Sequence, residues 1–164
     1  MDSKFTISIS SQLGKLILEF NGDKLSSATL DGNARARKES LSLDKYVHGS
    51  QIKSVMQKIN NYFSSAISLN SISVDAQGTA FQKSVWHELS KIPLGETRTY
   101  GDIAKKLNSS ARAVGNACRK NPVAIIVPCH RVVSAKGLGG YAGETEGKQL
   151  NIKRWLLEHE GVHL

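Results

Sequence analysis

The chain has 164 residues, enough to bury the core of one large domain or two small ones. It carries 22 Lys and Arg against 14 Asp and Glu, a formal net charge of +8, which favours a polyanionic partner such as nucleic acid, although a merely basic soluble protein has the same balance. Because two cysteines are too few for a disulfide framework and no apolar run could span a membrane, we expect a cytoplasmic protein without an export signal or membrane contact.

The first half of the chain has the pattern of a small α/β domain. Apolar and polar residues alternate in three segments, which predicts a meander of antiparallel strands at 5–9, 16–20 and 24–30. The Asn21-Gly22 pair is a strong signal for the second hairpin. Between residues 50 and 67 the apolar residues fall at helical spacing, so we expect an amphipathic helix that covers the meander.

A domain boundary is predicted near the middle of the chain. Ile72 and Val74 indicate one more short strand, and residues 75–78 have the composition of a linker. The boundary gives an N-terminal domain at 1–77 and a C-terminal domain at 78–164.

The C-terminal domain is predicted to begin with a capped helix. Thr79 and Gln82 form a capping-box pattern at its start. The apolar stripe that follows continues to Ile92 and includes Phe81 and Trp86, which we expect in the core.

Two shorter helices follow. Thr99 is a suitable N-cap for a helix at 100–107, and a polar break at 108–109 precedes another helix that starts near Ser110. Two short helices around a tight turn are typical of a helix-turn-helix.

The helix at 111–119 consists largely of small residues. Small side chains allow close packing against another helix, and equally they allow insertion into a DNA groove, where Arg112 would reach a phosphate or a base. The basic charge and the preceding turn favour DNA. A helix lined with alanine makes few base-specific hydrogen bonds, so we expect binding that is independent of sequence.

The segment 124–133 places a cysteine and a histidine between two apolar runs. The first run predicts a buried strand, which Pro128 ends in front of Cys129. Burial alone is typical of a structural cysteine that packs as a small hydrophobe. The neighbours make a functional cysteine an equal alternative, because His130 and Arg131 are predicted to lower the thiol pKa below about 8.5 and to hold part of it as the nucleophilic thiolate.

Two further segments complete the chain. The glycine-rich stretch 134–143 is either a backbone that approaches a ligand closely or a flexible loop. A final helix is predicted at 148–160. Glu158 and Glu160 would ordinarily face solvent there, but one of them would be able to orient His130 as a carboxylate does in a catalytic triad.

The C-terminal half, about residues 79 to 163, resembles the O6-alkylguanine-DNA alkyltransferases, also called methylated-DNA–protein-cysteine methyltransferases. The family's active-site signature corresponds to Pro128-Cys129-His130-Arg131-Val132, and the segments around it stand in the family's order: Arg112-Ala113-Val114-Gly115, Asn121-Pro122-Val123, Gly140-Tyr141-Ala142-Gly143 and Arg154 to Gly161. The resemblance implies an α/β (α+β) fold. A small ribonuclease-H-like α/β domain would precede a mostly helical, winged-helix-like domain with the helix-turn-helix.

For DNA binding, the resemblance implies a monomer that holds double-stranded DNA through its minor groove and flips the damaged guanine out of the stack. Arg112 would fill the vacated place. Tyr100 would press the adjacent 3′ phosphate and donate toward the guanine ring. The other residues implied at the DNA are Ala111, Ala113, Gly115 and Arg119.

For the chemistry, the resemblance implies that Cys129 accepts the alkyl group of O6-alkylguanine, and of O4-alkylthymine, in one irreversible turnover per molecule. His130 would be the base for the thiol, through a water, and Glu160 would orient it. Asn121 would brace the helix-turn-helix against the active-site segment. The base would be held by the carbonyls of Cys129 and Val132 and by the loop of Tyr141, Ala142 and Gly143. Neither a cofactor nor a metal, zinc included, is expected.

Two rival functions share part of this pattern. A non-catalytic damage binder of the alkyltransferase-like kind would lack the acceptor cysteine, so the presence of Cys129 argues against it. An unrelated cysteine hydrolase would turn over repeatedly, and the positive charge and the helix-turn-helix argue against that function.

Overall fold

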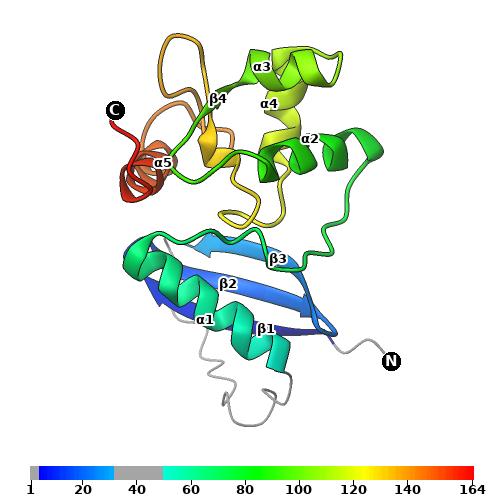
Figure 1. Cartoon of the computed structure of the whole chain (residues 1–164), viewed down its shortest axis with the longest axis vertical. Coiled ribbons are helices and arrows are strands. Elements are labelled where there is room, and N and C mark those ends of the chain that lie inside the picture. Colours follow the sequence, from blue (N-terminus) through cyan, green and yellow to red (C-terminus); the bar gives the residue numbers. More distant parts are fainter. Residues whose placement is uncertain (1–3, 32–49) are drawn as a thin grey trace. The chain divides into compact units, whose positions relative to one another are not determined.

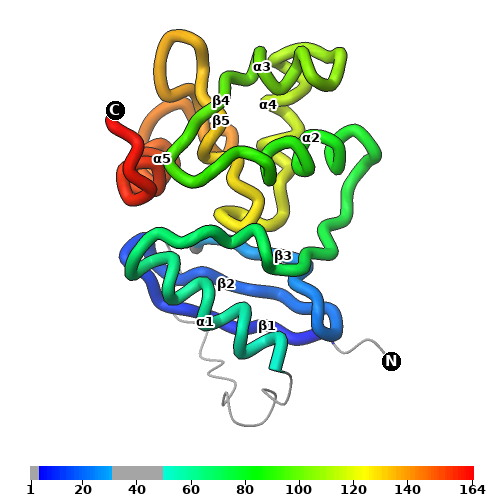
Figure 2. The backbone as a smooth tube through the Cα atoms, viewed as in Figure 1, coloured from blue at the N-terminus to red at the C-terminus, as the bar shows by residue number. Residues whose placement is uncertain are grey.

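The computed structural model describes residues 4–31 and 50–164. The chain divides into two compact units, 1–76 and 77–164, and each is described by itself. Figures 1 and 2 show the sheet with its helix in the first unit and the helical second unit.

The first unit is an antiparallel meander with one helix. Its strands are β1 (Lys4–Ser11), β2 (Gly14–Asn21) and β3 (Lys24–Asp31), in the order β1-β2-β3, and its helix is α1 (Ser50–Ser65). The three predicted strands and the helix are therefore confirmed. Gly22 has a φ of +58°, the left-handed conformation that the hairpin turn requires there.

The core of the first unit follows from the period of each element. Alternate residues of β2 (Leu16, Leu18, Phe20) are at most 1% exposed, and the buried face of α1 includes Ile59 and Tyr62. The strand predicted at 72–74 is wrong, because Val74 makes only an isolated bridge to Leu25.

The second unit is mostly helical. Its elements are α2 (Ala80–Ser90), β4 (Arg98–Thr99), α3 (Tyr100–Lys106), α4 (Ala111–Arg119), the short 3₁₀ helix η2 (Cys129–Arg131), β5 (Val132–Val133) and α5 (Lys148–His159). The predicted caps are confirmed, because Thr79 and Thr99 each form a capping box. The helix predicted to start near Ser110 does so, and the Ser110 side chain caps it by accepting a hydrogen bond from Ala113 N–H. These caps satisfy amide groups that would otherwise have no partner at the helix starts.

Helix α2 packs on α4 through a buried tryptophan. Trp86 is 4% exposed, and its indole Nε1 donates to the Ala117 carbonyl at 2.9 Å. The prediction for Phe81 is wrong, since this side chain is 37% exposed. Phe81 has the spacing of the apolar stripe, but it lies in the first turn of α2, ahead of the buried residues Val85, Trp86 and Leu89.

The strand predicted in front of Cys129 is also wrong. Residues 124–127 form a tight turn closed by a hydrogen bond from Val127 N–H to the Val123 carbonyl at 3.0 Å. The Asn121 side chain holds this turn, because its Nδ2 donates to the Val127 carbonyl at 2.8 Å and its Oδ1 accepts from Val123 N–H at 3.0 Å. A side-chain amide thus replaces the partner strand that the apolar run would need.

The only parallel strand pair among the described residues, β4 with β5, fixes the position of the cysteine segment. Arg98 pairs with Val132 and Thr99 with Val133. The pair therefore brings the residues after Cys129 beside the start of α3. No helix in the described ranges, 4–31 and 50–164, is long and apolar enough to cross a membrane.

We predict that Trp86→Phe lowers the free energy of unfolding by about 1–3 kcal/mol, because the buried hydrogen bond to the Ala117 carbonyl is lost. Urea denaturation followed by circular dichroism measures the change. Trp155→Phe, at a half-buried tryptophan of α5, is the matched control. A larger loss in the control than in Trp86→Phe would contradict this account of how α2 is held.

Candidate active site

Cys129 begins η2, directly after the turn held by Asn121. As a residue Cys129 is partly exposed, whereas the next two residues, His130 and Arg131, are buried at 0% and 4% exposure. The Val132 N–H donates to the Cys129 carbonyl and closes the 3₁₀ turn. The turn therefore separates a partly exposed cysteine from two ionisable side chains that enter the core.

The carboxylate of Glu160 receives both buried side chains. His130 Nε2 lies 2.8 Å from Glu160 Oε1, and Arg131 donates from Nε to Oε2 and from Nη2 to Oε1, each at 2.9 Å. The remaining Arg131 nitrogen, Nη1, donates to the Ile92 carbonyl at 2.7 Å. Glu160 is 6% exposed, while Glu158 faces solvent, so Glu160 is the carboxylate that contacts the histidine.

This arrangement determines the charge state of the histidine. Burial alone would raise the pKa of Glu160, but hydrogen bonds from His130 and Arg131 outweigh it and lower that pKa to about 2. Burial lowers the pKa of His130 against the opposing effect of Glu160, so the ring is neutral at pH 7. An ionised carboxylate only accepts hydrogen bonds, and the proton of the neutral ring is therefore assigned to Nε2.

The other ring nitrogen, His130 Nδ1, consequently carries a lone pair. It is buried and has no hydrogen-bond partner among the residues that the structure describes. A neutral imidazole with a fixed tautomer and an unoccupied lone pair is suited to act as a general base.

The expected lowering of the thiol pKa by the His130 ring and Arg131 is wrong, and the His130 ring does not contribute because it is neutral. Burial raises the pKa of Cys129, and the groups that oppose burial are the Asn121 side chain, Lys153 and the backbone amides of Cys129 and His130. Arg131 does not contribute because its guanidinium is fully engaged by Glu160 and the Ile92 carbonyl. The thiol is therefore protonated at rest and has to lose its proton during a reaction.

Sequence reasoning missed Lys153. Its side chain is fully buried, and Nζ donates to the carbonyls of Val132 at 2.6 Å and Gly140 at 2.9 Å. Nζ also lies 5.8 Å from the centre of the Tyr100 ring. Burial lowers the pKa of Lys153 to about 8, although Cys129 and Cys118 act in the opposite direction. The spacing of the apolar residues could have indicated that Lys153 is buried. Leu156 and Leu157 lie three and four residues further along α5, so Lys153 shares their buried face.

The glycine-rich segment packs against Tyr100. A Cβ on Gly139 would lie 3.1 Å from the Tyr100 ring, and Gly139 has a φ of +74°, so only glycine fits this position without strain. The Tyr100 hydroxyl donates to the Gly140 carbonyl at 3.3 Å. Burial, followed by the two cysteine thiols, raises the pKa of Tyr100 to about 12, so its hydroxyl keeps its proton at neutral pH.

The remaining residues that were expected to bind the flipped guanine lie next to Cys129 and in the glycine-rich segment. Tyr141 is 8% exposed, and burial together with the neighbouring Cys129 raises its pKa well above 10. Ala142 and Gly143 both have a positive φ, +50° and +83°. The carbonyls of Cys129 and Val132 already accept one hydrogen bond each, and each retains a second lone pair.

Apart from Tyr100, the first residue of α3, the residues expected at DNA lie on α4. Ala111, Arg112 and Arg119 are exposed, and Ala113 and Gly115 are half-buried. The Arg119 guanidinium packs on the glycine-rich segment, since a Cβ on Gly143 would lie 2.6 Å from its Nε. The structure therefore brings Arg119 to the loop, and Arg112 lies in the first turn of the same helix. Within 4–31 and 50–164 no cluster of His, Cys, Asp and Glu could hold a metal ion.

Residues 80–162 match the sequence family described as the DNA binding domain of 6-O-methylguanine DNA methyltransferase. The chain belongs to this family. The methylated-DNA–protein-cysteine methyltransferase of Methanosarcina acetivorans is 44% identical over 122 residues, which cover 72% of this chain and 75% of the relative. The resemblance found in the sequence is thus confirmed.

Solved structures of the family have the same mixed α/β architecture. The O6-methylguanine methyltransferase of Mycobacterium tuberculosis is 35% identical, with a TM-score of 0.75 over 96% of this chain and 93% of that one. A crystal structure of the enzyme from the same organism in complex with DNA is 38% identical, with a TM-score of 0.75 over 93% and 90% of the two chains.

We predict that Glu160→Gln lowers the free energy of unfolding at pH 7 by about 3–5 kcal/mol, because it leaves the buried Arg131 without its counter-charge. The wild type should lose stability as pH falls from 4.5 toward 2, since a carboxyl whose folded-state pKa is depressed stabilises the fold only while it is ionised. Urea denaturation at a series of pH values measures both effects. The variant should lack this part of the acid dependence.

Glu158→Gln, at an exposed carboxylate of the same helix, is the matched control and should behave like the wild type. An acid dependence that is the same in Glu160→Gln and in the wild type would contradict the assigned pairing.

Proposed function

We propose that this chain repairs DNA by transferring the alkyl group of O6-alkylguanine, and of O4-alkylthymine, to Cys129. The observation that carries the proposal is that η2 places a partly exposed cysteine directly before a buried, neutral histidine whose Nε2 proton is held by Glu160. Membership of the methyltransferase family supplies the class of reaction.

The proposed reaction is a direct displacement at the carbon attached to O6. The Cys129 thiol passes its proton through a water to His130 Nδ1, and the imidazolium is stabilised by the ionised Glu160. The sulfur then forms a bond to the alkyl carbon as the carbon–O6 bond breaks. The guanine that leaves is neutralised by a proton donated to its ring by Tyr100, whose hydroxyl is protonated at neutral pH. Tyr100 then regains a proton from solvent as the His130 imidazolium releases its own, so the net transfer is the thiol proton to guanine.

Each molecule is expected to react once. The product is a thioether, which water does not cleave under physiological conditions, and reversal would need a second nucleophile. Cys118, the other cysteine, is buried, and burial raises its pKa to about 12, so its thiol is unreactive.

For DNA binding we propose that α3 and α4 act as a helix-turn-helix in the minor groove and that the protein acts as a monomer. Arg112 would enter the stack where the damaged base leaves it, and Tyr100 would press the 3′ phosphate. Flipping costs a few kcal/mol and costs least for a base whose pairing is already weakened, as an O6-alkyl group does. The flipped base would meet the Val132 carbonyl and the backbone of Ala142 and Gly143.

We assign these steps to a winged-helix-like domain at 78–164. Asn121 supports the assignment, because its amide holds the turn between α4 and Cys129. We further propose that the N-terminal domain, 1–77, has a ribonuclease-H-like plan, for which its meander with one helix is the supporting feature.

We predict that a duplex with a radiolabelled methyl group on O6 of one guanine transfers the label to the protein until one equivalent is bound. Cys129→Ser should retain no label, since serine lacks a nucleophile of comparable acidity. Cys118→Ser is the matched control and should be labelled like the wild type. Repeated turnover would contradict the proposal, as would labelling of Cys129→Ser.

We predict that Arg112→Ala slows methyl transfer from duplex DNA by about tenfold or more, since the flipped state loses the side chain that fills the stack. Transfer from the free O6-methylguanine base should be unchanged, because that substrate needs no flipping. Single-turnover rates with both substrates measure the difference. Equal loss with both substrates would place Arg112 in the chemistry and contradict its assigned position.

A further inference from the structure

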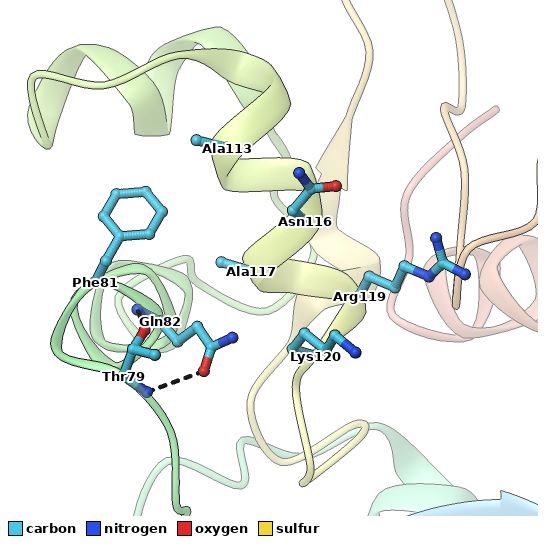
Figure 3. Close-up of a pocket in the computed structure, with 8 residues that line it drawn as sticks. All are labelled: Thr79, Phe81, Gln82, Ala113, Asn116, Ala117, Arg119 and Lys120. Carbon is cyan, nitrogen blue, oxygen red and sulfur yellow. Dashed lines mark hydrogen bonds between the residues drawn. The ribbon is translucent and has the colours of Figure 1, made fainter.

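An open groove lies between the first turn of α2 and one side of α4 (Figure 3). It encloses about 600 Å³ and is lined by Thr79, Phe81, Gln82, Ala113, Asn116, Ala117, Arg119 and Lys120. Of these residues, only Ala113 and Arg119 are among those assigned above to DNA binding. Phe81, at 37% exposure, stands at its edge as an aromatic side chain that the core leaves uncovered.

The walls of the groove are fixed before any ligand binds. The Trp86 indole ties α2 to the Ala117 carbonyl at 2.9 Å. The capping box of Thr79 and Gln82, drawn in part in Figure 3, holds the first turn of α2. Gly78 lets the chain pass beneath this turn, because a Cβ there would lie 2.5 Å from the Trp86 ring. A preformed groove binds without first paying for the ordering of its walls.

The lining of the groove suits a sugar-phosphate backbone. It contains two cations, Arg119 and Lys120, and no carboxylate. Figure 3 shows the Arg119 and Lys120 side chains both directed away from Phe81. Because the Arg119 guanidinium also packs on Gly143, Lys120 is the cation that remains for a ligand of the groove. A phosphate would meet Lys120 and the amide of Asn116 or Gln82, and the apolar face of a deoxyribose would meet Phe81 and Ala113.

The position of the groove on α4 indicates which strand it faces. Ala113, Ala117 and Lys120 recur at helical spacing and form the stripe that lines the groove. Gly115 lies on the opposite side of the helix, where a Cβ would contact the Tyr100 ring at 4.0 Å. Arg112 and Arg119, seven residues apart, share the exposed face between these two sides.

The two strands of a minor groove run along opposite sides of whatever element enters it. If Tyr100 takes the damaged strand on one side of α4, the other strand lies on the side of α2. We propose that the α2/α4 groove holds the backbone of the strand opposite the lesion and so gives the protein a preference for duplex over single-stranded DNA. This inference rests on the proposed function.

The test compares Lys120→Glu with Lys83→Glu, a matched change on an exposed residue of α2 that does not line the groove. Binding and single-turnover methyl transfer are measured on a duplex and on the same damaged strand alone. Lys120→Glu should weaken duplex binding about tenfold and leave single-strand binding unchanged, because only the duplex supplies the second backbone. Lys120→Arg should bind the duplex as tightly as the wild type does. Lys120→Ala should reduce the slope of log binding constant against log salt concentration by about the value of one phosphate contact.

Full duplex affinity in Lys120→Glu would overturn the groove assignment. An equal loss in Lys83→Glu, or an equal loss on both forms of DNA, would show a general charge effect and would also overturn it. Loss of self-association in sedimentation, with DNA binding intact, would assign the groove to a second copy of the chain instead.

If the wild type transfers no methyl group from either substrate, the proposed function fails, whereas transfer with an unaffected Lys120→Glu removes only the groove. Phe81→Ala, which changes no charge, should reduce duplex affinity in the same direction.

Discussion

The buried carboxylate of Glu160 is the interaction on which the rest of the active site depends. It neutralises Arg131 and fixes the proton of His130 on Nε2. One carboxylate therefore supplies both the counter-charge of a buried guanidinium and the hydrogen-bond acceptor of a buried neutral imidazole. An unpaired guanidinium could not be buried at 4% exposure, and an imidazole without a fixed acceptor would exchange tautomers. The same pairing holds the end of α5 against η2. Stability and chemistry therefore share a single ion pair.

The thiol is governed by a different balance. Cys129 is not kept as a thiolate, because burial outweighs the nearby Lys153 and the hydrogen bond from Asn121. A protonated cysteine is protected from indiscriminate alkylation and oxidation, which matters for a protein that would be consumed by its first reaction. The nucleophile would form only when His130 accepts the proton. Lys153 meanwhile joins β5 to the glycine-rich segment under Tyr100 and so shapes the place where a base would lie.

The sequence predicted the local structure well and the long-range contacts poorly. The three strands of the first unit, the helices and the caps at Thr79 and Thr99 followed from period and capping chemistry, which act within a few residues. The strand before Cys129 was wrong because Asn121 supplies side-chain hydrogen bonds that a propensity argument does not count. Arg131 and Lys153 were misjudged or missed because their partners, Glu160 and two loop carbonyls, are distant in the chain. The exposure of Phe81 likewise depends on what covers the first turn of α2, which the spacing of apolar residues leaves open.

The most direct test of the central claim is the tautomer of His130, measured by long-range proton–nitrogen correlation in protein with ¹⁵N-labelled histidine. The chain has five histidines, and the His130→Gln variant identifies the signals of the ring in question. The account predicts a neutral ring at pH 7 with the proton on Nε2 and an unprotonated Nδ1, persisting below the ordinary histidine pKa. A proton on Nδ1, or a charged ring at pH 7, would contradict it, since no lone pair would then be available to Cys129.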